Sequence, residues 1–111
     1  MPPATMTVAG GICGSDKFTR ALEKTEGRPI GYKAGLTNTA VQKRFNYDQP
    51  MRGTLYRSMI LRSGAEIDAK YGARPVFEAD LVAVVKSSAI QDAKTPLEAL
   101  ARVGAIYPFM E

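Results

Sequence analysis

Two acidic side chains inside an apolar stretch are the first candidates for chemistry. Residues 76–85 read VFEADLVAVV, and Glu78 and Asp80 are the charged residues in this run. Successive side chains of a β-strand alternate, so these two share one face, roughly 6.6 Å apart along the chain. Two carboxylates on a partly covered face repel each other and lose hydration, which a proton, a Lys or Arg partner, or a cation would relieve. Oxygen ligands favour Mg²⁺, Mn²⁺ or Ca²⁺, although two ordinary acids on a solvated strand fit the same pattern.

Three further positions carry polar groups that could act on a substrate. Glu111 follows the apolar run IYPFM, where an acid could bind a cation or simply reach solvent. Lys33 lies in the mostly apolar run PIGYKA, where it could meet an enolate or carboxylate, or extend along the sheet into water. The segment NYDQPMRG has the composition of a polar turn, but its Arg52 could also hold a carboxylate through two hydrogen bonds beside Gln49. We therefore take Arg52 and Gln49 as candidate substrate-binding residues.

Composition excludes several kinds of site. The chain contains no histidine, which removes Ser-His-Asp and Cys-His catalysis and histidine metal ligands, and leaves proton transfer to carboxylates, lysines or tyrosines. Cys13 is the single cysteine, so no internal disulfide can form, and a free thiol indicates a reducing compartment.

Charge and hydropathy limit the partners that we expect. The net charge of +4 comes from scattered basic residues without aromatic interleaving, which makes a nucleic-acid module the weaker alternative to binding a small anion. No apolar run approaches the roughly 20 residues of a membrane span, and the first residues lack the pattern of a secretory signal. We therefore expect a cytoplasmic protein that binds neither membrane nor nucleic acid.

The residue pattern predicts an alternation of helices and strands that would position these side chains. Each predicted helix has a capping residue before it: Ser15 for 16–26, Asn38 for 39–45, and Thr95 for a helix from Pro96 to Val103. Strands are predicted at 29–34, around Leu55, and at 59–61, 66–69, 76–85 and 105–111. The remaining segments are predicted to be irregular: a loose lead-in over 1–14, a loop over 46–53, a turn at Ser63–Gly64 and a loop over 70–75. The face of the 76–85 strand opposite the acids is apolar and is expected to meet a core.

Four segments together resemble a known enzyme family. GYKAGLTNTAVQKRF at 31–45 is similar to that family's GYKIGLTS-x-AVQ, and DQPMRGTL at 48–55 to its DQPDFGxL loop. FEADLVAVV at 77–85 is similar to its EAEIAFVL strand, and YPFME at 107–111 to a strand ending in P-x-x-E. Each motif alone is weak, but their order and spacing agree from residue 29 to 111, whereas the first 28 residues match poorly. The chain resembles the N-terminal portion of the 2-keto-4-pentenoate hydratase/4-oxalocrotonate decarboxylase family.

The resemblance implies a fold. The family belongs to the fumarylacetoacetase-like superfamily, whose core is a mixed β-sandwich roll behind a small helical region. We therefore expect an α+β chain with short N-terminal helices followed by the start of that roll. Residues 1–28 would be a lead-in with an N-terminal helix, and 29–111 an incomplete N-terminal part of the hydratase domain, because family members are much longer. The isolated chain is expected to be inactive and the intact protein to be a homo-oligomer.

The resemblance also implies residue roles. At the matching positions Glu78, Asp80 and Glu111 would bind Mg²⁺ or Mn²⁺, with Asp80 one methylene shorter than the family's glutamate. Lys33 would contact the substrate or transfer a proton. Met51 replaces a family acid associated with the proton chemistry, and Arg52 replaces the aromatic residue after it, so the chain departs from the family pattern at these two positions.

The activity that the resemblance implies is a metal-dependent lyase reaction of aromatic catabolism. Such an enzyme adds water to a 2-hydroxy-2,4-dienoate (2-keto-4-pentenoate), an anionic 2-oxo or enol acid, and gives a 4-hydroxy-2-oxo acid. Two alternatives stay open: a decarboxylase of the 4-oxalocrotonate type, and a non-catalytic homologue that serves as a partner subunit. The carbon–carbon hydrolases of the superfamily resemble a histidine-dependent design, which the lack of histidine disfavours.

Overall fold

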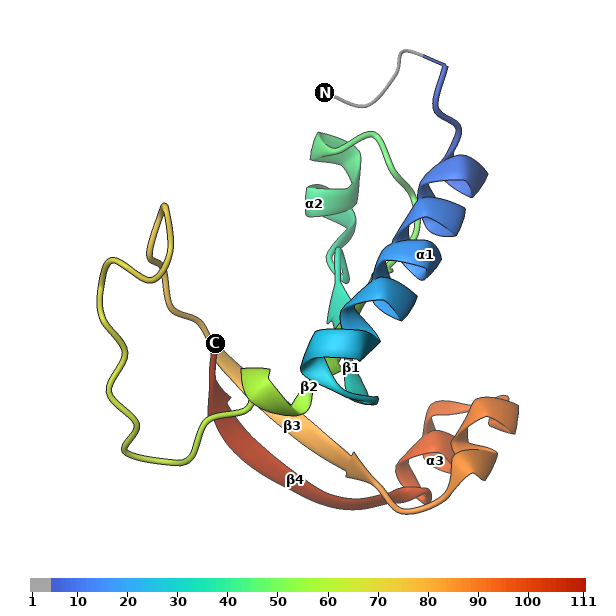
Figure 1. The fold of residues 1–111 in the computed structure, drawn as a ribbon. Helices are drawn as coiled ribbons and strands as arrows, with labels where there is room; N and C mark the ends of the chain where they lie inside the picture. Colours follow the sequence, from blue (N-terminus) through green and yellow to red (C-terminus); the bar gives the residue numbers. More distant parts are fainter. Residues whose placement is uncertain (1–4) are drawn as a thin grey trace. The chain divides into compact units, whose positions relative to one another are not determined.

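The computed structural model describes residues 5–111, and the chain divides into two compact units, Met1–Ala65 and Glu66–Glu111. Each unit contains one two-stranded antiparallel sheet and at least one helix, as Figure 1 shows. The architecture is therefore α+β, as predicted. In the described residues, no helix has both the length and the apolar character that crossing a membrane requires.

The first unit begins with a helix longer than the sequence pattern predicts. Helix α1 spans Val8–Glu26, and the Thr7 hydroxyl caps it by accepting a hydrogen bond from the Gly10 amide at 3.1 Å. The prediction of a loose lead-in is thus wrong for residues 8–14, and Ser15 lies inside the helix instead of capping it. Three glycines in this stretch lower its helix propensity and mask its periodicity. The predicted stop at Gly27 is confirmed, with φ of 79°.

A β-hairpin follows α1 and carries two of the candidate residues. Strand β1 spans Pro29–Gly35, confirming the predicted strand, and pairs with β2, Met51–Tyr56. The prediction of a loop over 46–53 is wrong for its last three residues, because residues 51–53 pair with residues 33–35. Between the strands lies α2, Thr39–Arg44, which confirms the predicted helix; the Asn38 side chain caps it by accepting from the Ala40 amide at 2.8 Å.

Tyr56 connects α1 to the hairpin by a hydrogen bond. Its side chain is 1% exposed, and it is the fully buried residue of the described chain. Its hydroxyl donates a hydrogen bond to the carbonyl oxygen of Thr19 at 2.9 Å. The Thr19 and Thr54 hydroxyls lie 3.5 Å apart at the same contact. Helix and hairpin therefore meet through one aromatic side chain and a small polar cluster, with little apolar packing.

The segment after β2 contains no strand among residues 57–78. A 3₁₀ turn, η1, covers Arg57–Met59, and the predicted strands at 59–61 and 66–69 are wrong. The Asp68 side chain accepts a hydrogen bond from the Lys70 amide at 2.8 Å, a local turn that competes with extended structure. The predicted turn at Ser63–Gly64 is confirmed, with φ of 80° at Gly64. The loop predicted over 70–75 is also irregular in the structure.

The second unit is built on the pairing of β3, Ala79–Val85, with β4, Val103–Met110. The 3₁₀ segment η2, Ser88–Asp92, and helix α3, Pro96–Leu100, connect the two strands (Figure 1). The predicted Thr95 cap is confirmed, since its hydroxyl accepts from the Glu98 amide at 3.2 Å. The Glu98 carboxylate does not complete the capping box at the Thr95 amide but accepts from the Lys94 amide at 2.7 Å. The helix ends three residues before its predicted end, because Val103 already pairs with Val85.

The apolar face of the β3–β4 ladder is open to solvent. Leu81, Ile106 and Met110 lie on the face opposite the acids and are 66%, 51% and 62% exposed. The prediction that this face meets a core is therefore wrong for the chain described here. Three half-buried positions of the ladder, Val82, Ala105 and Phe109, lie instead on the face that carries the acids.

Candidate functional site

Glu78 and Glu111 are direct cross-strand partners. The Glu78 amide donates to the Glu111 carbonyl oxygen at 2.8 Å, and the Glu111 amide donates to the Glu78 carbonyl oxygen at 3.0 Å. Residues that exchange both hydrogen bonds in an antiparallel ladder have Cα atoms about 5.5 Å apart and side chains on the same face. Two acids separated by more than 30 positions in the sequence thus come together at one end of the β3–β4 ladder.

Asp80 lies on the same face, two residues along β3. It pairs with Phe109, which in turn is two residues before Glu111, so the register continues without interruption from the Glu78–Glu111 pair. The Asp80 carboxylate is turned back onto the backbone, where its Oδ1 accepts from the Leu81 amide at 2.7 Å. All three acids are solvent-exposed.

The three acids fit a divalent cation in donor type and in backbone register. Carboxylate oxygens are the ligands that Mg²⁺ and Mn²⁺ prefer, and strand alternation directs these three to one side. Their side chains are not gathered, however: across residues 5–111, no three acidic, histidine or cysteine side chains are close enough to hold an ion. Binding would require the three carboxylates to turn toward one another. The ligand set stays a prediction.

Lys33 is half-buried in β1, directly opposite Gly53 of β2. A Cβ atom built on Gly53 would lie 3.9 Å from the Lys33 Cβ, so the glycine leaves room beside the lysine stem. Met51 pairs with Gly35 and therefore lies on the same face, diagonal to Lys33. The position where the resembling family has an acid thus neighbours Lys33, and here it carries an apolar side chain.

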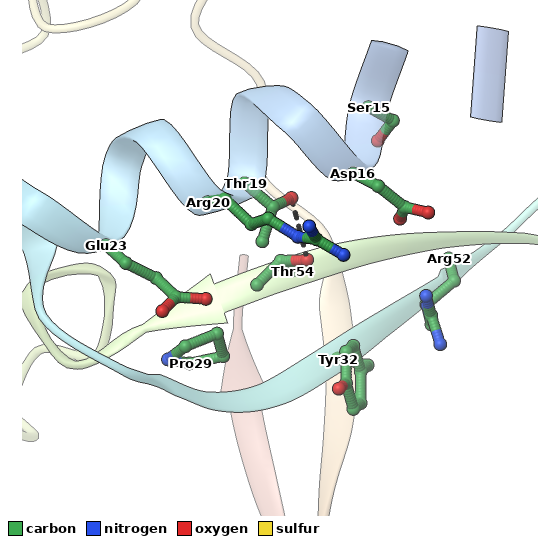
Figure 2. A pocket seen from close by; sticks show the side chains of 9 residues that line it. All are labelled: Ser15, Asp16, Thr19, Arg20, Glu23, Pro29, Tyr32, Arg52 and Thr54. Carbon is green, nitrogen blue, oxygen red and sulfur yellow. Dashed lines mark hydrogen bonds between the residues drawn. The ribbon is translucent and has the colours of Figure 1, made fainter. Parts of the chain in front are cut away.

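Arg52 points to the other side of the hairpin. Its guanidinium carbon lies 4.7 Å from the centre of the Tyr32 ring, a cation–π contact that holds the side chain in place. Both residues line a cleft between α1 and the hairpin, shown in Figure 2. The structure therefore does not bring Arg52 and Lys33 to one surface, because strand alternation puts them on opposite faces.

Gln49 lies elsewhere again, in the loop before β2. It lines a shallow depression together with Val8 and Ile12 of α1 and with Gln42 of α2. The Gln42 side chain is held by a hydrogen bond from its amide nitrogen to the Leu36 carbonyl oxygen at 2.7 Å. Gln49 and Arg52 are thus three residues apart in sequence but line different cavities, and their predicted roles in substrate binding are untested.

The sequence pattern did not single out the polar residues of α1 that face the hairpin. Asp16, Thr19, Arg20 and Glu23 line the cleft with Arg52. Their spacing of three and four residues, which puts them on one helix face, was the available signal.

Comparison with known proteins identifies the family. The chain is 39% identical over 66 residues to a 2-keto-4-pentenoate hydratase of Burkholderia vietnamiensis (strain G4 / LMG 22486), a match that covers 59% of this chain and 25% of that protein. It is 32% identical over 84 residues to a 4-oxalocrotonate decarboxylase of Pseudomonas sp, a match that covers 76% of this chain and 32% of that protein. The chain belongs to the 2-keto-4-pentenoate hydratase/4-oxalocrotonate decarboxylase family.

The chain spans about a quarter to a third of the length of these two curated relatives. Both members of the hydratase/decarboxylase family are named as enzymes, which supports an enzymatic role for this chain's family. No family model matches the sequence, and no solved structure matches it significantly.

Proposed function

We propose that the intact protein carrying these residues is a divalent-metal-dependent hydratase. It would add water to a 2-hydroxy-2,4-dienoate and give a 4-hydroxy-2-oxo acid, as a step in the catabolism of aromatic compounds in the cytoplasm. The single observation that supports this best is the register of the β3–β4 ladder, which pairs Glu78 with Glu111 and keeps Asp80 on the same face. Two family motifs that are far apart in sequence become neighbours in this way.

The proposed roles follow the chemistry of each side chain. Glu78, Asp80 and Glu111 would hold Mg²⁺ or Mn²⁺, which stabilises negative charge on a bound 2-oxo acid. Lys33, half-buried beside Gly53, would transfer a proton. Arg52 has a guanidinium already ordered on Tyr32 and would bind a carboxylate, and Gln49, which lines a different cavity, would contact the substrate separately. Each role can be tested separately by substitution.

A metal titration tests the first of these roles. Mn²⁺ binding to the chain, followed by electron paramagnetic resonance, is expected to weaken at least tenfold on Glu78→Gln, since the variant removes a charged ligand. Glu66→Gln is the matched control, because Glu66 is an exposed acid of the same unit that belongs to neither strand of the ladder. No Mn²⁺ binding, or equal weakening by both variants, would contradict the proposed metal site.

The reaction is tested in the intact protein by loss of the ultraviolet absorbance of a 2-hydroxydienoate. We expect turnover that needs Mg²⁺ or Mn²⁺, that disappears on Glu78→Gln and on Lys33→Met, and that survives Glu66→Gln. Intact metal binding without turnover would replace the hydratase proposal with a non-catalytic partner subunit, which Met51 at the position of the family acid would explain.

Decarboxylation is the second candidate reaction, favoured by the match to the 4-oxalocrotonate decarboxylase, which covers more of this chain than the match to the hydratase. The two reactions share the proposed metal and the 2-oxo acid, and they differ in the product. Release of CO₂ from a 2-oxo dicarboxylate without consumption of the dienoate would assign the decarboxylase.

The fold of the intact protein is also a proposal. We infer that further strands extend the two hairpins into a fumarylacetoacetase-like roll that assembles as a homo-oligomer. The exposed apolar face at Leu81, Ile106 and Met110 supports this, because soluble proteins rarely leave such a face uncovered. Sedimentation of the intact protein measures its oligomeric state. Solvent protection of Leu81, Ile106 and Met110 in the intact protein measures whether the apolar face is covered.

A further inference from the structure

A polar cleft of ≈ 280 Å³ lies between α1 and the β1–β2 hairpin (Figure 2). The helix lines it with Asp16, Thr19, Arg20 and Glu23, which all lie on one helix face. A helix normally turns an apolar stripe toward the sheet that it covers. Here the helix meets the hairpin through the half-buried Thr19 and through Tyr56, and the exposed charged side chains Asp16, Arg20 and Glu23 lie beside this contact. Packing therefore does not account for these charges along the cleft.

Two arginines supply the positive charge of the cleft. Arg52 is held against the Tyr32 ring at 4.7 Å, so its position is set without a carboxylate partner. Arg20 extends from α1 toward the strand that bears Thr54, as Figure 2 shows. Among residues 5–111 its guanidinium has neither an ion-pair partner nor a side-chain hydrogen bond. Its donors are therefore available to a ligand.

Hydroxyl groups lie beside Arg20 at the centre of the cleft. The Oγ1 atoms of Thr19 and Thr54 are 3.5 Å apart, and both side chains are partly buried. One of these hydroxyls donates to the other, which leaves one hydroxyl proton for a ligand. A guanidinium together with a free hydroxyl donor matches a carboxylate, which accepts several hydrogen bonds.

Two acids limit what this carboxylate can be attached to. Asp16 and Glu23 lie about one helical turn on either side of Arg20, so the lining carries two positive and two negative side chains. Asp16 lies above Arg52 in Figure 2, whereas Glu23 lies over Pro29 at the other end, away from Arg52. An anion with several charges would be repelled by the acids, and a simple cation would be repelled by the arginines. A ligand with one positive and one negative charge is complementary to both the acids and the arginines.

We propose that this cleft binds a small zwitterion of the α-amino acid type. Arg20, Thr19 and Thr54 would hold its carboxylate, and Glu23 would hold its ammonium group. The cleft is smaller than the usual pocket for a drug-sized ligand, in keeping with a compact metabolite. The site goes beyond the proposed hydratase reaction: although Arg52 also lines it, it lies on the face of the hairpin opposite Lys33 and contains none of the proposed metal ligands.

Nuclear magnetic resonance titration of the chain tests the proposal with three probes that differ in charge. L-alanine is a zwitterion, propionate is the matching anion, and ethylammonium is the matching cation. We expect saturable shifts of the Thr19, Arg20 and Thr54 resonances with alanine, and shifts at least severalfold weaker with the other two. Equal binding of propionate and alanine would overturn the proposal, as would the lack of saturable shifts with alanine.

Substitutions separate the two halves of the site. Arg20→Gln is expected to weaken alanine binding about tenfold, the usual effect of losing one charge-assisted hydrogen-bond partner. Arg20→Lys keeps the charge and should retain part of the alanine binding that Arg20→Gln loses. Glu23→Gln should weaken the binding of alanine without weakening the binding of propionate. Equal weakening of the binding of both probes would refute the ammonium subsite. Arg44→Gln, on the exposed surface of α2, is the control and should change neither.

Discussion

Replacing Glu78 with glutamine is expected to change the stability of the β3–β4 ladder with opposite signs in the absence and presence of metal. Without metal, the Glu78 and Glu111 side chains lie on one face of a directly hydrogen-bonded pair, with backbone bonds of 2.8 and 3.0 Å. Like charges directly opposite each other destabilise an antiparallel pair. Removing one of them should therefore stabilise the metal-free ladder.

The size of the metal-free effect follows from this geometry. Cross-strand charge pairs contribute roughly 0.2–1 kcal/mol, and solvent around the exposed acids puts this pair near the middle of that range. About 0.5 kcal/mol corresponds to about a twofold slower opening of the ladder in Glu78→Gln. With Mn²⁺ at a hundredfold excess over its dissociation constant, metal binding stabilises the wild-type ladder by about 2.7 kcal/mol. Opening of the ladder then becomes about a hundredfold slower.

Amide hydrogen exchange of the β3 and β4 backbone measures this opening locally, without requiring the whole chain to unfold in one step. We expect Glu78→Gln to exchange more slowly than wild type without metal and much faster than wild type with Mn²⁺. Glu66→Gln serves as control and should follow the wild type in both conditions. Equal protection of wild type and Glu78→Gln by Mn²⁺ would refute the role of Glu78 as a ligand. Faster exchange of the metal-free variant would refute the cross-strand repulsion.

Three further substitutions test the fold that positions these sites. Tyr56→Phe removes the 2.9 Å hydrogen bond to Thr19 and should destabilise the first unit by about 1 kcal/mol in urea unfolding; an unchanged midpoint would mean that this bond contributes nothing. Gly27→Ala should cost about 1–3 kcal/mol because φ is 79° there, whereas Gly14→Ala, inside α1 with no heavy atom within 4 Å of a new Cβ, should be stabilising in the same assay. Thr95→Ala removes the cap of α3 and should cost about 1 kcal/mol by exchange of the α3 amides, with Thr37→Ala as a control outside any cap.

Elements with a local chemical signal could be predicted from the sequence. Asn38 and Thr95 each cap a helix through their own side chains, and Gly27 ends α1 with a dihedral angle that other residues avoid. Strands β1 and β4 were found for a related reason, since their apolar runs are bounded by glycine or by a helix end. In these segments the determining interaction lies within a few residues of the element that it defines.

Elements decided by a distant partner could not be predicted. Residues 51–53 have turn composition, yet they are extended because β1 offers them a hydrogen-bonding edge. Residues 59–61 have strand composition, yet they find no neighbouring strand in the described chain. Pairing in a β-sheet is non-local, so composition alone misassigned both segments in opposite directions.

The candidate site shows the same division. The shared face of Glu78 and Asp80 follows from strand alternation, but their proximity to Glu111 depends on the register with β4. The opposite faces of Lys33 and Arg52 follow from alternation too, once residue 52 is known to be in a strand. The α1 cleft was missed because it needs the contact between a helix face and a hairpin, which no motif in the sequence marks.

The side of the ladder on which the acids lie bears on the metal proposal itself. Val82, Ala105 and Phe109 are half-buried positions of the ladder that share the face of Glu78, Asp80 and Glu111. A carboxylate gains most from a cation where water is partly excluded, because the attraction between charges grows as the local dielectric falls. Phe109 lies directly across from Asp80 and is the nearest apolar cover on that face. The face that would benefit from a cation is therefore partly covered beside Asp80, although its acids and Tyr107 are exposed, whereas the opposite face, with Leu81 and Met110 exposed, carries no charge.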